Sequence, residues 1–152
     1  MALIVGVDAG GTKTIGVVAD ATGDIVKSAR VGGANLHVHG ELAVEKVLSG
    51  LLDELCPDER PEALCLGMAG VDRPGEDAMV RALLRRLGFR ANALVVNDAV
   101  VALAAGAHDR VGVVVIAGTG SIAYGTDRRG RSARAGGLGG DRLGAHHRLH
   151  RG

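Results

Sequence analysis

The sequence has almost no aromatic residues. Among 152 residues there is no tryptophan, and Phe89 and Tyr124 are the only other aromatic side chains. Proteins that bind single-stranded nucleic acid stack bases on aromatic side chains, so this class is disfavoured. The core must therefore be aliphatic, and a core can be built because 47% of the residues are apolar.

Excess charge, cysteine pairs and long apolar runs are also missing. The formal net charge is only +1, so neither nucleic acid nor an anionic membrane is expected as a partner. Cys56 and Cys65 form no CxxC pair and lie in apolar stretches, which predicts buried thiols in a reducing cytoplasm. Met1 leads directly into an apolar run without a signal peptide, and no run approaches the roughly 20 residues of a membrane span.

What the sequence does contain is a glycine-rich turn between two short apolar runs. We predict buried strands at residues 3–7 and 15–19, with Asp8 directly after the first. The glycines let backbone N–H groups approach a ligand closely, and hydroxyl and ammonium groups follow them, which suits phosphate. The predicted phosphate-binding residues are Gly10, Gly11, Thr12, Lys13 and Thr14.

Asp8 precedes this turn and would repel a phosphate. We therefore predict that its carboxylate holds a hydrated Mg²⁺. The alternative is an ordinary glycine-rich hairpin with an incidental acid, because one glycine motif is weak evidence.

The same pattern occurs a second time. With a shift of 107 residues (119 − 12), Gly11 falls on Gly118, and Thr12 falls on Thr119. Further matches are Ile15 with Ile122, Asp20 with Asp127, Gly23 with Gly130, and Thr14 with Ser121. A repeated unit is stronger evidence than a single motif. We therefore predict a second phosphate loop at Gly118, Thr119 and Gly120. Asp8 corresponds to Val115, so only the first copy carries an acid.

Between the copies, helices alternate with strands. We predict strands at residues 24–31, 63–68 and 93–96, and helices at 41–55, 75–87 and 99–107. Asn35 lies in a glycine-rich loop, where it either contacts sugar hydroxyls or only shapes the turn. His37 and His39 have strand-like spacing, and we expect them to be solvated instead of metal-bound.

Asp98 follows a predicted buried strand and begins a helix of small residues. Aspartate is a favoured N-cap, because the helix dipole favours its charge. A carboxylate at this place is also suited to act as a general base toward a hydroxyl group. The sequence leaves both readings open.

The last residues differ from the rest. Residues 141–152 are rich in Arg and His without apolar periodicity. We expect a disordered tail, with a metal site as the alternative.

Four motifs together resemble the sugar-kinase/heat-shock/actin superfamily, and within it the BadF/BadG/BcrA/BcrD-type ATPases that include N-acetylglucosamine kinases. The motifs are residues 8–14, 67–74, 97–99 and 118–121. The resemblance implies an α/β fold: a ribonuclease-H-like (actin-like ATPase) lobe with a mixed five-stranded sheet, followed by the first strands of an incomplete second lobe. The expected domains are residues 1–108, 109–140 and the tail 141–152.

The resemblance also implies an ATP-dependent amino-sugar kinase using Mg²⁺, with N-acetylglucosamine or glucosamine as substrate. Asp98 would be the catalytic base and Asp8 the Mg²⁺-positioning residue. Sugar-binding residues would be Asn35, Asp98, Ser121, Gly136 and Gly137. The alternative function is an ATPase module that switches a partner protein without phosphorylating a small molecule. The acyl-CoA reductase activators of this family carry cysteines that bind an iron–sulfur cluster. Cys56 and Cys65 lie elsewhere in the sequence, so this branch is disfavoured.

One departure concerns the end of the chain. Residues 141–145 stand where the family has a Gly-Asp-Glu-Gly-Ser motif followed by a full second lobe. We therefore expect an inactive fragment, with a frameshift near residue 140 as one explanation. An unfinished sheet would expose an edge and apolar surface, so a homodimer or aggregation is a further expectation.

Overall fold

The computed structural model describes residues 2–58, 60–90, 92–118 and 120–136. The chain forms two compact units, Met1–Asp98 and Ala99–Gly152. The boundary therefore falls at the start of a helix, earlier in the chain than the expected boundary at residue 108.

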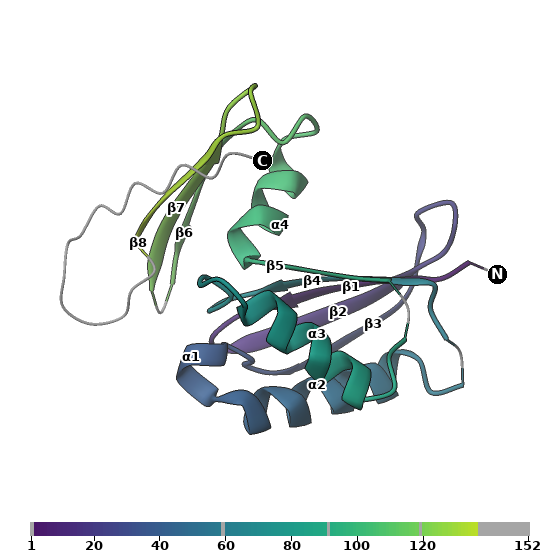
Figure 1. The fold of residues 1–152 in the computed structure, drawn as a ribbon. Helices are drawn as coiled ribbons and strands as arrows, with labels where there is room; N and C mark the ends of the chain where they lie inside the picture. Colours follow the sequence, from purple (N-terminus) through teal and green to yellow (C-terminus); the bar gives the residue numbers. More distant parts are fainter. Residues whose placement is uncertain (1, 59, 91, 119, 137–152) are drawn as a thin grey trace. The chain divides into compact units, whose positions relative to one another are not determined.

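The first unit is built on one mixed five-stranded sheet, as predicted (Figure 1). Its strands are β1 (Ile4–Ala9), β2 (Lys13–Ala19), β3 (Ile25–Gly32), β4 (Ala63–Met68) and β5 (Asn92–Val96), in the order β3-β2-β1-β4-β5. The first three pair antiparallel, whereas β1, β4 and β5 are parallel. The parallel strands thus end at one edge, where open α/β sheets bind ligands.

Helices α2 (Glu41–Leu55) and α3 (Glu76–Arg86) lie along one face of this sheet (Figure 1). The buried residues of α2 are Val44, Leu48, Leu51 and Leu55, which follow the 3.6-residue period of an amphipathic helix. The predicted helix 41–55 and the predicted strand 63–68 are both confirmed without a change in bounds.

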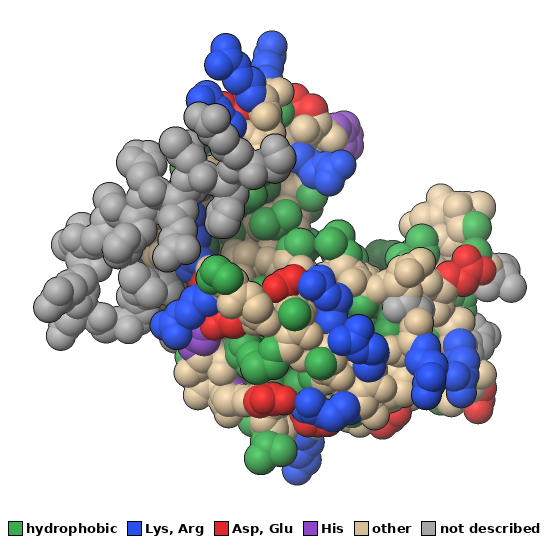
Figure 2. All heavy atoms as spheres, in the orientation of Figure 1, with side chains coloured by type: hydrophobic (Ala, Val, Ile, Leu, Met, Phe, Trp, Pro, Cys, Tyr) green, Lys and Arg blue, Asp and Glu red, His purple; other side chains and the backbone are tan. Residues whose placement is uncertain are grey.

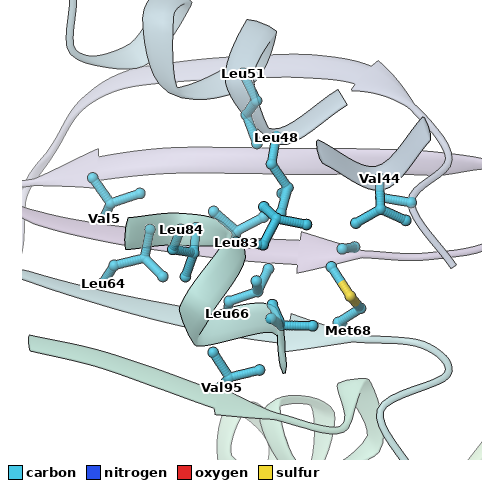
Figure 3. Packing of buried hydrophobic residues seen from close by; sticks show 14 of the residues in the cluster. Val5, Val44, Leu48, Leu51, Leu64, Leu66, Met68, Leu83, Leu84 and Val95 are labelled. Atoms are coloured by element: carbon cyan, nitrogen blue, oxygen red, sulfur yellow. The ribbon is translucent and has the colours of Figure 1, made fainter. Parts of the chain in front are cut away.

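The core lies between these helices and the sheet (Figure 3). Along β1, Val5, Val7 and Ala9 are buried, while Ile4 and Asp8 on the opposite face are exposed. The large side chains that are fully buried include Leu48, Leu51, Leu66, Met68, Leu83 and Leu84. Burying each such aliphatic side chain contributes about 1.5–3 kcal/mol, so a core whose only aromatic neighbour is the partly buried Phe89, among the described residues, can still be stable.

His37 and His39 are exposed, as expected, but their strand-like spacing does not mark a strand. Both lie in the short helix α1 (Leu36–His39), and Asn35 is its N-cap. The Asn35 side-chain oxygen accepts hydrogen bonds from the backbone N–H groups of His37 (2.9 Å) and Val38 (3.1 Å). This bonding is the usual capping role of asparagine. The N-cap therefore favours a helix here although the two histidines alternate as in a strand.

The second unit contains most of α4 (Asp98–Gly106) and a three-stranded antiparallel sheet. Its strands are β6 (Gly112–Ala117), β7 (Ser121–Thr126) and β8 (Ser132–Gly136), in the order β6-β7-β8. Along β6, the side chains of Val113 and Val115 are 73% and 69% exposed. One face of this sheet therefore carries uncovered apolar surface.

The repeat predicted from sequence is visible in the turns of both units. In one turn, Asp20 accepts hydrogen bonds from the backbone N–H groups of Thr22 and Asp24, and in the other Asp127 accepts from those of Arg129 and Arg131. In each turn a glycine with positive φ donates to the aspartate carbonyl oxygen: Gly23 at 90° and Gly130 at 73°.

The two glycine-rich turns differ by one residue. Ala9 pairs with Thr14 in the first hairpin, whereas Ala117 pairs with Ser121 in the second. The correspondence without a gap therefore holds after the turn but not before it. By strand pairing, Asp8 corresponds to Ile116, not to Val115.

No helix in the described part of the chain is both long and apolar enough to cross a membrane. On the face shown in Figure 2, Lys and Arg side chains are interspersed with acidic and apolar ones instead of forming one basic surface.

Candidate functional site

The candidate site lies where β1, β4 and β5 end. Asp8 pairs with Gly67 of β4, and Gly67 pairs with Val96 of β5. The register places Asp8 in one row with the segment that leads to Asn97 and Asp98. Four segments of the first unit therefore meet at one edge of its sheet: the turn after β1, the loop after β3, and the segments after β4 and β5.

The turn after β1 has features that fit a phosphate group. The backbone N–H of Gly10 donates to the carbonyl of Lys13 (2.9 Å). In the described part of the chain the N–H groups of Gly11 and Thr12 donate no hydrogen bond. Thr12 and Lys13 are exposed, so these N–H groups, with the lysine charge, form a suitable anion cradle.

Thr14 differs from the expectation for a phosphate contact. Its side chain is fully buried on β2, and its hydroxyl has no hydrogen-bond partner among the described residues. Strand alternation turns it toward the core, on the side opposite to that of the exposed Lys13. The residues of the turn that remain accessible to a phosphate group are therefore Gly10 to Lys13.

The loop after β3 is bound to this turn by its backbone. Ala34 donates from its N–H to the carbonyl of Gly10 (2.9 Å). A Cβ at Gly33 would clash with the carbonyl of Gly11. The loop continues through Asn35 and Leu36, whose N–H donates to the carbonyl of Ala69 after β4 (3.3 Å). Asn35 is thus held beside two of the segments that end at the site.

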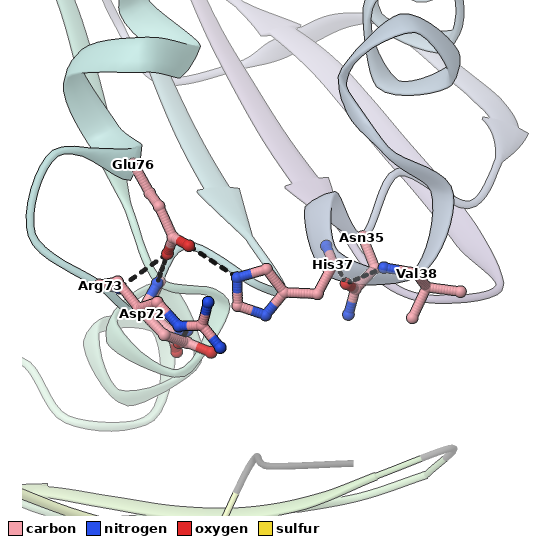
Figure 4. A network of polar contacts seen from close by, with 7 residues as sticks. Asn35, His37, Val38, Asp72, Arg73 and Glu76 are labelled. Carbon is pink, nitrogen blue, oxygen red and sulfur yellow. Dashed lines mark hydrogen bonds and ion pairs between the residues drawn. The ribbon is translucent and has the colours of Figure 1, made fainter. Parts of the chain in front are cut away.

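A polar network joins the remaining segments (Figure 4). Glu76, at the start of α3, accepts hydrogen bonds from the backbone N–H groups of Asp72 and Arg73, both at 2.7 Å. Its other oxygen lies 2.7 Å from Nε2 of His37 on α1. Asn97 donates from its side-chain amide to the carboxylate of Asp72 (2.5 Å).

The protonation of Glu76 reflects these contacts. Burial by itself would raise the pKa of this carboxyl, but the hydrogen bonds from His37, Arg73 and Asp72 outweigh burial and hold the pKa below its ordinary value. Glu76 is therefore a carboxylate anion that accepts hydrogen bonds from three residues.

Asp98 is the first residue of α4, directly after Asn97. The N-terminal end of a helix favours a negative charge. The position fits both readings of Asp98, as helix-terminal acid and as general base.

The described residues contain no group of three or more side chains suited to bind a metal ion. Asp8 is exposed and lies two residues before the turn that is predicted to bind phosphate. A Mg²⁺ ion at Asp8 would therefore take its other ligands from phosphate oxygens and water, which is a common arrangement for this ion.

The remaining predicted residues lie in the second unit. Gly118 donates to the carbonyl of Gly120 (2.9 Å), which matches the bond between Gly10 and Lys13. Gly136 pairs with Ile122, and a Cβ on Gly136 would clash with the carbonyl of Ser121. Two predicted site residues, Thr119 and Gly137, lie outside the described residues.

The sequence profile of the BadF/BadG/BcrA/BcrD ATPase family matches residues 5–145. The chain belongs to this family. Within it, the chain is 37% identical over 144 residues to an N-acetylmuramic acid/N-acetylglucosamine kinase of Clostridium acetobutylicum, covering 91% of this chain and 47% of that protein. It is 36% identical over 151 residues to an N-acetyl-D-glucosamine kinase of Dictyostelium discoideum, covering 90% and 47%.

Solved structures show the same fold. A glucokinase of the ROK family from Streptomyces griseus, solved with glucose and AMPPNP, superposes with a TM-score of 0.62 at 23% identity, covering 93% of this chain and 51% of that one. The BadF/BadG/BcrA/BcrD family member described here thus has the fold of sugar kinases and actin-like ATPases. It spans about half the length of the curated relatives it matches.

Sequence reasoning missed His37 and Glu76 as parts of this site. Asp72 lay in a segment already singled out, but its link to Asn97 was not foreseen. The only local signal was the acid at the start of a predicted helix, which ordinary helix-terminal preference also explains.

Proposed function

We propose that this chain supplies the sugar-binding edge and a phosphate loop of an ATP-dependent kinase acting on an N-acetylated amino sugar, such as N-acetylglucosamine. One observation carries the proposal: the turn after β1, the Asn35 loop and the Asn97–Asp98 segment meet at one sheet edge, joined by hydrogen bonds at Gly10, Ala69 and Asp72. The names of the curated relatives support the substrate class.

In this mechanism Asp98 is the general base. Its carboxylate accepts the proton of a sugar hydroxyl as that oxygen bonds to the terminal phosphorus, while the bond from phosphorus to the oxygen of ADP breaks. ATP, when bound, supplies the phosphoryl group. The residues of the chain contribute mainly position and charge, as is usual for phosphoryl transfer.

The glycine-rich turns hold the phosphates. We assign phosphate contacts to Gly10, Gly11, Thr12 and Lys13 in the first unit and to Gly118, Thr119 and Gly120 in the second. Asp8 would hold Mg²⁺ through water, and the ion would neutralise phosphate charge. Ser121, Gly136 and Gly137 are assigned to the sugar, together with Asn35.

Asn35 bears on the choice of sugar. Its side-chain oxygen already accepts two backbone hydrogen bonds, so its amide nitrogen is the group left to face a ligand. An N–H donor requires an acceptor. N-acetylglucosamine and glucosamine differ only in the nitrogen substituent, where the acetyl carbonyl oxygen offers an acceptor and the ammonium group of glucosamine offers none. We therefore favour the N-acetylated sugar over the free amine.

Isothermal titration of this chain tests the proposal, with N-acetylglucosamine, glucosamine and glucose as ligands. The expected result is saturable binding that is strongest for N-acetylglucosamine and weakened at least about tenfold by Asn35→Ala, equal to about 1.4 kcal/mol. Binding that ignores the sugar's identity and Asn35 would contradict the proposal.

A further inference from the structure

Glu76 contacts two parts of the candidate site that come from different places in the sequence. On one side, His37 of α1 lies 2.7 Å from its carboxylate, and α1 begins at the N-cap Asn35. On the other side, Glu76 accepts from the backbone of Asp72, which in turn accepts from the Asn97 side chain. Figure 4 shows the Glu76 carboxylate between the His37 ring and the Asp72–Arg73 backbone.

We propose that Glu76 is a positioning residue, which fixes the Asn35 loop and the Asn97–Asp98 segment in one relative arrangement. This inference rests on the proposed function and adds to it a residue that does not itself touch the sugar. The chain of contacts runs from Asn35 through α1 and His37 to Glu76, and from there through Asp72 to Asn97.

The burial of the network supports this role. The side chain of Glu76 is only 13% exposed, and that of His37 is 33% exposed. A hydrogen bond to a carboxylate that is shielded in this way is weakened less by competing water than one at an open surface. Loss of Glu76 would leave two backbone N–H groups and the His37 ring without their shared acceptor, and the part-buried N–H of Asp72 is the group for which this costs most.

Close packing nearby limits how far the two segments can move. A Cβ on Gly70 would lie 2.8 Å from the side-chain oxygen of Asn35 and 3.2 Å from the backbone N of His37. The segment after β4 therefore lies directly against the N-cap of α1. A shift of α1 would be transmitted to this segment, which also carries Asp72.

Two measurements on this chain test the proposal. The first is a double-mutant cycle read by the NMR signals of the Asn97 side-chain amide. His37→Ala should shift these signals clearly more in the wild-type background than in the Glu76→Ala background, because the Glu76 carboxylate is the main link between His37 and Asp72 and packing at Gly70 supplies only the remainder. Equal shifts in both backgrounds would overturn the proposal.

The second measurement is the affinity for N-acetylglucosamine by isothermal titration. Glu76→Ala should weaken binding at least about tenfold, and Glu76→Gln should stay within about threefold of wild type, because its carbonyl can still accept from Asp72 and Arg73. Glu54→Ala, an exposed acid on α2, is the matched control and should bind as wild type does. If Glu76→Ala binds the sugar as tightly as the control, the proposal is wrong.

The outcomes separate this proposal from the proposed function. If the wild-type chain binds no sugar, the proposed function fails, and the NMR cycle alone decides whether Glu76 couples the two segments. If Glu76→Ala does not fold, Glu76→Gln replaces it in the cycle. Its amide then faces the His37 ring in place of a carboxylate, so the shift caused by His37→Ala should change, and an unchanged shift would overturn the proposal.

Discussion

Gly33 lies directly against the backbone carbonyl of Gly11, so that a single added Cβ would overlap with that oxygen. The loop after β3 and the turn after β1 are therefore in close backbone contact. The neighbouring hydrogen bond from Ala34 to Gly10 fixes the same approach. The glycine-rich turn after β1 is thus held in shape by the loop that leads to Asn35, the residue that we propose contacts the sugar.

The first prediction follows from this contact. Gly33→Ala should displace the turn and lower the free energy of unfolding by about 1–3 kcal/mol, as expected for overpacking. It should also weaken the binding of Mg-ADP, measured by isothermal titration, because the N–H groups of Gly11 and Thr12 would move.

Gly50→Ala is the matched control for Gly33. Gly50 lies inside α2, and a Cβ there would meet nothing within 4 Å. Alanine in a helix interior stabilises the fold by about 0.5–1 kcal/mol relative to glycine. The urea concentration at the midpoint of unfolding should therefore rise. A Gly33 variant that behaves like the Gly50 variant would show that the contact is unimportant.

The second prediction concerns the buried hydroxyl of Thr14. Thr14→Val should leave the chain as stable or stabilise it by about 1 kcal/mol, because it removes a buried polar group without a described partner. Valine also suits a strand. Urea unfolding gives the free energy, and titration with Mg-ADP should give an unchanged affinity. A large loss of affinity would instead support the original assignment of Thr14 to phosphate.

The third prediction is that the free energy of unfolding depends on pH in the acidic range through Glu76. The pKa of Glu76 is held below its ordinary value near 4.5, so its folded form favours the carboxylate. Its contribution to stability is present above that ordinary value and is lost as the pH falls through the lowered pKa. Urea unfolding from pH 6 to pH 3 should therefore show a steeper loss for wild type than for Glu76→Gln, and parallel curves would contradict this.

The fourth prediction tests Asp8. Asp8→Asn should weaken the binding of Mg-ADP while changing the affinity for ADP without Mg²⁺ much less, because the carboxylate is assigned to the cation. Asp24→Asn, an exposed acid outside the site, is the control. Equal losses with and without Mg²⁺ would assign Asp8 a role other than holding the ion.

The sequence was sufficient where its periodicity was strong. The helix α2 and the strand β4 have the predicted bounds because their apolar residues follow one period and are bounded by clear breaks. The family, the mixed sheet and the repeated turn were also predicted correctly. These features depend on local pattern or on motifs that are contiguous in the sequence.

The sequence was insufficient where the outcome depended on contacts between distant segments. The alternation of His37 and His39 suggested a strand, but the capping oxygen of Asn35 and the acceptor Glu76 hold a helix there. The one-residue difference between the two turns could not be seen in a match without gaps, because only strand pairing reveals it. Burial of Thr14 likewise depends on which face of β2 meets the core.

The most direct test of the central claim is an NMR titration of this chain with N-acetylglucosamine, followed by assignment of the backbone amides that shift. We predict that the shifts concentrate at the edge where β1, β4 and β5 end, at Asn35, Ala69, Asn97 and Asp98. An absence of shifts, or shifts confined to the separate hollow lined by Cys56, Phe89 and Arg90, would contradict the account.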